Sequence, residues 1–97
     1  MSIKPKVVEE INAIKVSDRV EIKHPSDSCI IINAGLAHIF IHKAYYRKKV
    51  IVDVSWSGTS ESNKLVVQFS KDLQEIIKIA EQCKKILIKH GQYEENK

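Results

Sequence analysis

Apolar and polar residues alternate along the middle of the chain, a pattern typical of strands with one buried face. The most regular alternation runs from His38 to Trp56. Its isoleucines and valines share one face, which we expect to pack in the core: Ile39, Ile41, Val50, Val52 and Val54. Trp56 shares their parity, so we expect it to cover the end of that core. Phe40 then lies on the wet face, between His38 and His42.

Three further stretches also predict strands. Val20 and Ile22 alternate with polar residues until Pro25 interrupts the pattern, and residues 29–33 form a β-branched run. The last predicted strand covers residues 64–69, with three apolar side chains on one face: Leu65, Val67 and Phe69. Turn-forming residues separate these segments: Pro25 to Ser28, Asn33 to Gly35, and the polar loop from Ser57 to Asn63.

Helical spacing appears at both ends of the chain. A short N-terminal helix is predicted over about residues 5–15, with Pro5 in its first turn. A longer helix is predicted over about residues 71–89, with Ser70 as its N-cap and Asp72 near the positive end of its dipole. Gly91 ends this helix, and we expect residues 91–97 to form a frayed tail.

The apolar stripe of the C-terminal helix is wider than contact with one sheet requires. Its members are Leu73, Ile76, Ile77, Ala80, Cys83 and Leu87, flanked by Ile79 and Ile86. The helix is therefore either deeply buried or packed on one flank against a second copy of the chain. Together these elements predict a single α+β domain over residues 1–97, with antiparallel strands over about residues 19–69 packed against the long C-terminal helix.

Composition and charge narrow the classes of partner. Apolar residues make up 43% of the chain and charged residues 29%, which is typical of a folded globular protein. The formal net charge of +4 favours polyanionic partners only mildly. Arg19 and Arg47 are the only arginines, so contacts to phosphates and stacked bases are favoured over base reading in a duplex groove.

The cysteines and the N-terminal sequence indicate the cellular compartment in which the protein is expected. Cys29 and Cys83 do not form a disulfide framework or a zinc motif, and we expect both to be reduced, buried, small apolar residues. We find neither a signal-peptide apolar region nor a run approaching the ~18 apolar residues of a membrane span. These features predict an intracellular, cytoplasmic protein that does not enter a membrane.

The turn between residues 43 and 49 combines cations and aromatic rings. Such a turn concentrates positive potential and offers faces for base stacking, which contributes about 1–3 kcal/mol per base. The candidate nucleic-acid-binding residues are Phe40, His42, Lys43, Tyr45, Tyr46, Arg47, Lys48 and Lys49. The alternative interpretation is a solvated hairpin whose lysines protect a sheet edge and keep the protein soluble.

Catalytic and metal-binding signatures are not found in the sequence. We find no glycine-rich phosphate loop, no nucleophile paired with a base and no paired carboxylates, so we predict no enzyme, no catalytic residues and no cofactor. His38 and His42 would lie about 13 Å apart on a strand, too far to share one metal ion. The lysines of the C-terminal helix alternate with acidic residues, as on a solvated helix face.

The order of elements resembles the transcriptional coactivator positive cofactor four family, and small single-stranded-DNA-binding proteins of viruses and archaea are similar in outline. The resemblance covers roughly Ala37 to Lys89, and is strongest in the strand Lys49–Val54 and in the strand-to-helix junction Phe69–Leu73. It implies a homodimer whose helices pair while curved sheets bind unpaired strands. The turn is longer here than in the family and Trp56 matches none of its aromatic positions, so no binding residue is transferred.

Two functional hypotheses follow. The first is binding of single-stranded nucleic acid, DNA rather than RNA, with little sequence specificity, by a homodimer. The second is a small, viral-type interaction or inhibitor protein whose sheet face or hairpin docks another protein. A structural dimer without a ligand is a third possibility.

Overall fold

The computed structural model describes residues 2–43, 50–56 and 63–93, and of residues 63–66 it describes the backbone alone. Within these ranges the chain forms two helices and four strands. Their order is α1 (Pro5–Asn12), β1 (Val20–Ser26), β2 (Cys29–Ala34), β3 (Ala37–Lys43), β4 (Val50–Trp56) and α2 (Asn63–Lys89).

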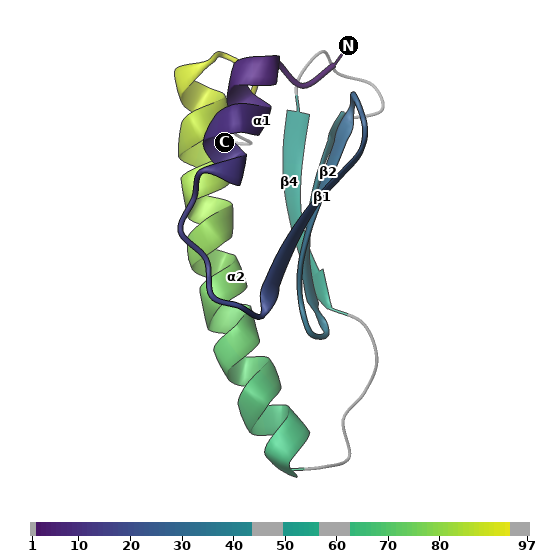
Figure 1. Cartoon of the computed structure of the whole chain (residues 1–97), viewed down its shortest axis with the longest axis vertical. Coiled ribbons are helices and arrows are strands. Elements are labelled where there is room, and N and C mark those ends of the chain that lie inside the picture. The colour runs from purple at the N-terminus through teal and green to yellow at the C-terminus, as the bar shows by residue number, and fades with distance from the viewer. Residues whose placement is uncertain (1, 44–49, 57–62, 94–97) are drawn as a thin grey trace.

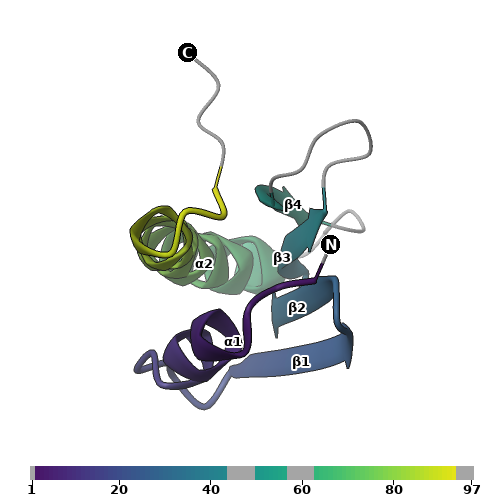
Figure 2. The same cartoon turned by 90° about the horizontal axis from the view of Figure 1, so that it is seen from above.

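The strands form one antiparallel sheet in the order β1-β2-β3-β4. Both helices lie on the same side of this sheet, with α2 running along its length and α1 beside the C-terminal half of α2 (Figures 1 and 2). The described residues therefore form two layers, helices on one side and sheet on the other. This arrangement confirms the predicted α+β fold.

The core lies between the two layers, and the strand alternation was read correctly. Ile39 and Ile41 of β3 are fully buried, and their cross-strand partners on β4 are Val54 and Val52. From the helical side the core receives Val7 and Ile11 of α1 and the following residues of α2: Ile76, Ile79, Ala80, Cys83 and Leu87.

The strand predicted over residues 64–69 is wrong, because these residues form the first turns of α2. Leu65, Phe69 and Leu73 are spaced four residues apart, so the same apolar residues that alternate on a strand also follow one face of a helix. Ser70 consequently lies inside α2 rather than at its N-cap, and Asp72 lies in the second half of its third turn rather than near its start. The sheet has four strands, not five.

The wide apolar stripe of α2 is explained within one chain. The helix packs against β2, β3 and β4 and also against α1, so two neighbours bury adjacent flanks of the same helix. Ile77, predicted as part of the stripe, lies beyond both neighbours and is 47% exposed. The width of the stripe therefore does not require a second copy, and the homodimer stays a prediction.

Trp56 does not cover the core as predicted. It is 62% exposed and touches Phe69 of α2 edge-on, with ring centroids 6.5 Å apart. Its cross-strand partner is Ala37 at the end of β3, so few atoms of the sheet reach its ring. Trp56 does lie on the same side of the sheet as Val50, Val52 and Val54, as predicted, but at this end of β4 the packing against α2 is limited.

The chain ends differ in part from the prediction. α1 ends at Asn12 rather than near residue 15. Gly91 has a φ of +71°, which confirms it as the left-handed end of α2. The expected frayed tail is wrong for Gln92, which is buried because its main-chain oxygen accepts from Val50 N at 2.7 Å and its Oε1 accepts from Lys4 N at 2.9 Å. Tyr93 also pairs with Val50.

Candidate nucleic-acid interface

The side of the sheet that faces away from α1 and α2 presents three rows of side chains, one residue from each strand per row. Cross-strand register defines the middle row as Lys23, Ile31, Phe40 and Asp53. One flanking row is Glu21, Asn33, His38 and Ser55, and the other is Ser26, Cys29, His42 and Ile51. We call this set of residues the open face, because neither described helix covers it (Figure 2).

Phe40 occupies the centre of the open face. It is partly exposed, and its cross-strand neighbours are Ile31 on β2 and Asp53 on β4. The ring of His38 lies beside it, with centroids 6.0 Å apart and planes tilted by 49°. Ile51 in the next row is also partly exposed. The open face therefore has an apolar and aromatic centre with polar surroundings, as the sequence predicted for Phe40.

The two histidines each bond a polar side chain of a neighbouring strand. His38 Nδ1 lies 2.8 Å from Asn33 Oδ1, and His42 Nε2 lies 2.8 Å from Asp53 Oδ2. The described ranges hold no group of three or more His, Cys, Asp or Glu side chains that could bind a metal ion. The polar bonds fix the rings on either side of Phe40, and Asp53 places a carboxylate next to the predicted site.

Lys43 ends β3 and is exposed, but its cross-strand partner is the buried Val50, so its side chain points to the side of the sheet opposite that of Phe40 and His42. The other predicted binding residues lie outside the described residues: Tyr45, Tyr46, Arg47, Lys48 and Lys49. Of the eight predicted residues, the structure thus brings two onto the open face, Phe40 and His42, and places Lys43 at the end of the same strand. The chain enters the basic and aromatic turn directly from Lys43 and leaves it at Val50 of β4.

The sequence analysis did not predict an ion pair between Arg19, which precedes β1, and Asp72 of α2. Arg19 Nε and Nη2 each donate at 2.7 Å to the two carboxylate oxygens of Asp72, whose side chain is 4% exposed. Gly35 packs beneath the pair, since a Cβ there would lie 2.7 Å from Asp72 Oδ2. The hydrogen bonds from Arg19, and from Gln68, hold the pKa of Asp72 below its usual value. The signal in the sequence was Asp72 itself, a charged residue beside the apolar stripe of the helix, which needs a partner when it is buried.

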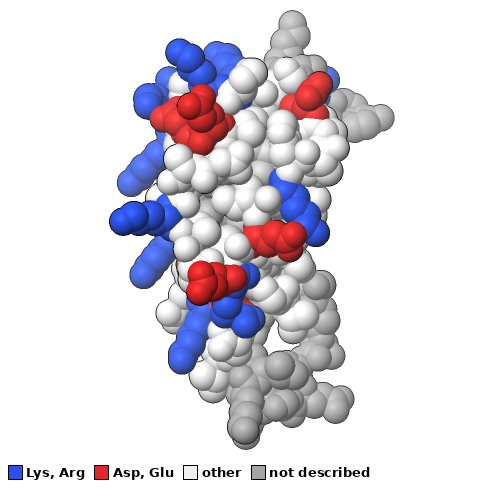
Figure 3. Space-filling model, in the orientation of Figure 1, with Lys and Arg blue, Asp and Glu red and all other residues white. Residues whose placement is uncertain are grey.

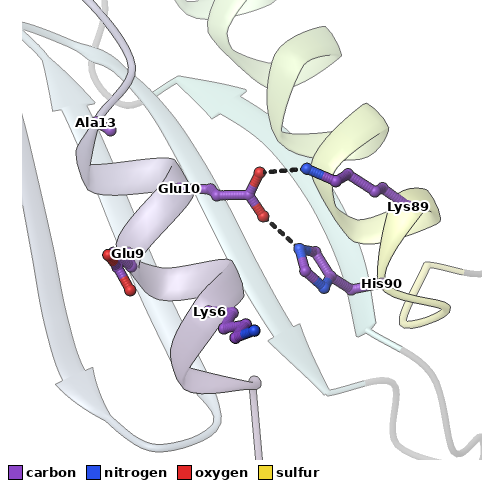
Figure 4. Close-up of a pocket in the computed structure, with 6 residues that line it drawn as sticks. All are labelled: Lys6, Glu9, Glu10, Ala13, Lys89 and His90. Carbon is purple, nitrogen blue, oxygen red and sulfur yellow. Dashed lines mark hydrogen bonds and ion pairs between the residues drawn. The ribbon is translucent and has the colours of Figure 1, made fainter.

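A second missed cluster lies in a groove of about 480 Å³ between α1 and the end of α2 (Figure 4). Glu10 accepts from Lys89 Nζ at 2.8 Å and also contacts His90 Nε2, and these bonds keep the pKa of Glu10 below its usual value. Lys6 and Glu9 also line the groove. Because Lys89 and His90 both bond Glu10, this cluster fastens α1 to the end of α2 and suggests no chemistry.

Both cysteines are free, but only one is buried as predicted. Cys83 is fully buried in α2, and this burial raises the pKa of its thiol to about 12. Cys29 is only partly buried because it lies on the open face, opposite His42. Cys29 therefore belongs to the open face, whereas Cys83 belongs to the core between sheet and helices.

Comparisons with family models, with curated proteins and with solved structures give no significant match for this chain. The structure bears on the resemblance noted from the sequence at one point: Phe69 to Leu73 lie inside α2, so the proposed strand-to-helix junction does not occur there. Neither described helix is both long and apolar enough to cross a membrane.

Proposed function

We propose that the open face binds single-stranded nucleic acid, DNA in preference to RNA, with little sequence specificity. One observation carries the proposal: both described helices cover the same side of the sheet, and the other side presents a partly exposed Phe40 at its centre. This surface leads through Lys43 into the turn that holds three cations and two tyrosines: Arg47, Lys48, Lys49, Tyr45 and Tyr46. Aromatic platforms beside positive charge are the usual means of binding unpaired strands.

The described side chains suggest distinct roles on this surface. Phe40 offers a ring face on which one base stacks. Ile31 and Ile51 extend this apolar surface toward the bases that adjoin the stacked one. Lys43 is exposed where β3 enters the basic turn, and with the lysines of that turn it contacts phosphate as a flexible point charge. Stacking on a ring and lysine contacts to phosphate read no base edges, which agrees with low sequence specificity.

Asp53 opposes phosphate on the β4 side of the open face. Its carboxylate lies across from Phe40, is largely exposed and bonds His42. A bound strand therefore places its phosphates toward the basic turn that follows β3 and keeps them away from the middle of β4, because like charges repel. The same residue offers a matched gain-of-binding variant, Asp53→Asn.

Protein docking on the same surface is the second candidate. The observation in its favour is mixed charge: Glu21 and Asp53 lie on the open face with Lys23, around the apolar centre. An apolar centre with a rim of both signs also suits a protein partner. This alternative keeps the site and changes the ligand.

The proposal is tested by titrating a labelled single-stranded oligonucleotide at several salt concentrations. Phe40→Ala should weaken binding by about 1–3 kcal/mol because one stacked base is lost. Lys48→Ala with Lys49→Ala should reduce the slope of log K against log salt by about 1.4, since each phosphate contact on a single strand contributes about 0.7. Asp53→Asn should tighten binding.

Lys6→Ala with Lys15→Ala is the matched control for the turn variant, because both lysines are exposed and both are absent from the open face. It should leave the affinity nearly unchanged. No binding at low salt, or equal weakening by this control and the turn variant, would sink the proposal. Capture of a defined protein that survives nuclease treatment and is lost in Phe40→Ala would favour protein docking instead.

A further inference from the structure

The outer side of α2 carries a row of lysines that the open face does not use. Lys71, Lys78 and Lys85 follow one another at seven-residue intervals, so they drift by only about 20° per step around the helix. At about 1.5 Å per residue the outer two are about 21 Å apart along the axis. All three are exposed, and Figure 3 shows Lys and Arg side chains projecting along the edge of the molecule formed by α2. We call these three residues the lysine row.

The lysine row points away from the sheet. The buried residues of α2, such as Ile76 and Cys83, lie on the opposite half of the helix by 3.6-residue spacing. The lysine row and the open face are therefore on opposite sides of the two-layer fold. Any ligand of one surface leaves the other accessible.

The lysines of the row make no ion pair with the described protein. No ion pair or hydrogen bond among the described residues involves Lys71, Lys78 or Lys85. The described acids of α2 have other partners instead: Asp72 pairs with Arg19, Glu75 accepts from Ser17, and Glu81 contacts Lys84. Glu75 and Glu81 lie three or four residues from members of the lysine row and flank it, but their carboxylates bond Ser17 and Lys84. The three ammonium groups of the row are therefore exposed and unpaired among the described residues.

The side chains around the lysine row indicate the kind of anion. Gln74 and Gln82 flank it by helical spacing, and both are exposed. Phe69, the aromatic residue of the described part of α2, contacts Trp56 rather than this surface. Unpaired bases would therefore find no ring to stack on. Three exposed apolar residues of α2, Val67, Ile77 and Ile88, lie 10 or 11 residues apart, whereas a helix that rests on a membrane presents a continuous apolar face beside its lysines.

We propose that the lysine row binds the phosphate backbone of a double-stranded nucleic acid. This site goes beyond the proposed function, since it lies on the other side of the molecule and involves no stacking. A straight, rigid line of charges complements a stiff duplex, and lysine contacts phosphate without reading bases. Gln74 and Gln82 add amide donors that can reach neighbouring phosphate oxygens.

The test measures binding of a short duplex at several salt concentrations. In a triple variant, Lys71→Gln, Lys78→Gln and Lys85→Gln, the slope of log K against log salt should fall by about 2.7, since each duplex phosphate contact contributes about 0.9. The control, Lys6→Gln with Lys15→Gln and Lys84→Gln, removes the same charge from other exposed or partly exposed positions. It should change the slope by less than half as much.

Single-strand binding separates this proposal from the previous one. The triple variant should retain single-strand affinity, and Phe40→Ala should retain duplex affinity. Equal loss of duplex binding in the triple variant and its control would reduce the effect to net charge and overturn the proposal. So would a wild-type protein that does not bind duplex at low salt, or a lysine row needed for anionic phosphatidylserine vesicles but not for duplex.

Discussion

At the scale of single residues, the ion pair between Arg19 and Asp72 is the most consequential contact of the fold. It joins the residue before β1 to α2, and Gly35 in the β2–β3 turn supplies the space for it. Gly35 has a φ of +58°, a conformation that side-chain-bearing residues adopt at a cost. Three segments distant in sequence are thus held at one point on the edge of the core.

The lowered pKa of Asp72 predicts a pH-dependent contribution to stability. A carboxyl whose pKa is lower in the folded than in the unfolded state stabilises the fold above its unfolded value of 3.8, and the contribution is lost as the pH falls below it. Asp72→Asn should therefore lower the free energy of unfolding by about 1–2 kcal/mol at neutral pH. The deficit relative to wild type should shrink below about pH 4, as urea unfolding at several pH values would show. An equal deficit at every pH would contradict this role.

At the scale of elements, α2 is where sequence and structure differ most. The pattern of Leu65, Val67 and Phe69 suits a strand, and Ser70 suits an N-cap, so local signals agreed on a boundary that does not exist. The competing helical spacing of Leu65, Phe69 and Leu73 prevails because these turns continue a helix whose next residues are buried. Short apolar runs do not distinguish the two periods without tertiary context.

A proline substitution distinguishes the two boundaries. Lys71→Pro would be tolerated if the helix began at residue 71, because the first turn does not need that N–H. Since Lys71 lies inside α2, we expect the substitution to lower the free energy of unfolding by about 3 kcal/mol. Lys71→Ala, with the same loss of charge, should change it little. Chemical denaturation that gives equal values for both variants would refute the continuous helix.

The remaining elements were predictable to different degrees. Strict alternation of apolar and polar residues was enough to predict β3, β4 and the side of the sheet on which Phe40 lies. A one-residue slip would exchange the two sides, so the apolar pattern allows one register only. Residues such as Trp56 and Gln92 could not be placed, because their exposure depends on which distant atoms reach them. Gln92 is held by Lys4 and Val50, contacts that local pattern cannot reveal.

At the scale of the whole molecule, the two layers separate two candidate binding surfaces. The open face combines a ring, two isoleucines and a route to the basic turn, whereas the lysine row offers charge without rings. Each surface has one expected ligand, single strands on the first and duplex backbone on the second. Net charge of +4 alone would not separate these surfaces, so the placement of the helices on one side of the sheet is the decisive feature.

The native cysteines provide the most direct measurement of where a single strand binds. Cys29 lies on the open face beside His42, and Cys83 is fully buried with a thiol pKa near 12. A thiol reagent should therefore modify Cys29 in the folded protein and leave Cys83 unreacted until unfolding. Cys83 serves as an internal control for the integrity of the fold.

The decisive experiment follows the modification rate of Cys29 with and without a saturating single-stranded oligonucleotide. We predict protection that disappears at high salt, with Cys83 unreactive throughout, because the strand covers the open face and is held partly by phosphate contacts. An unchanged Cys29 rate under conditions in which the oligonucleotide is bound would place the strand elsewhere and contradict the assignment of the open face.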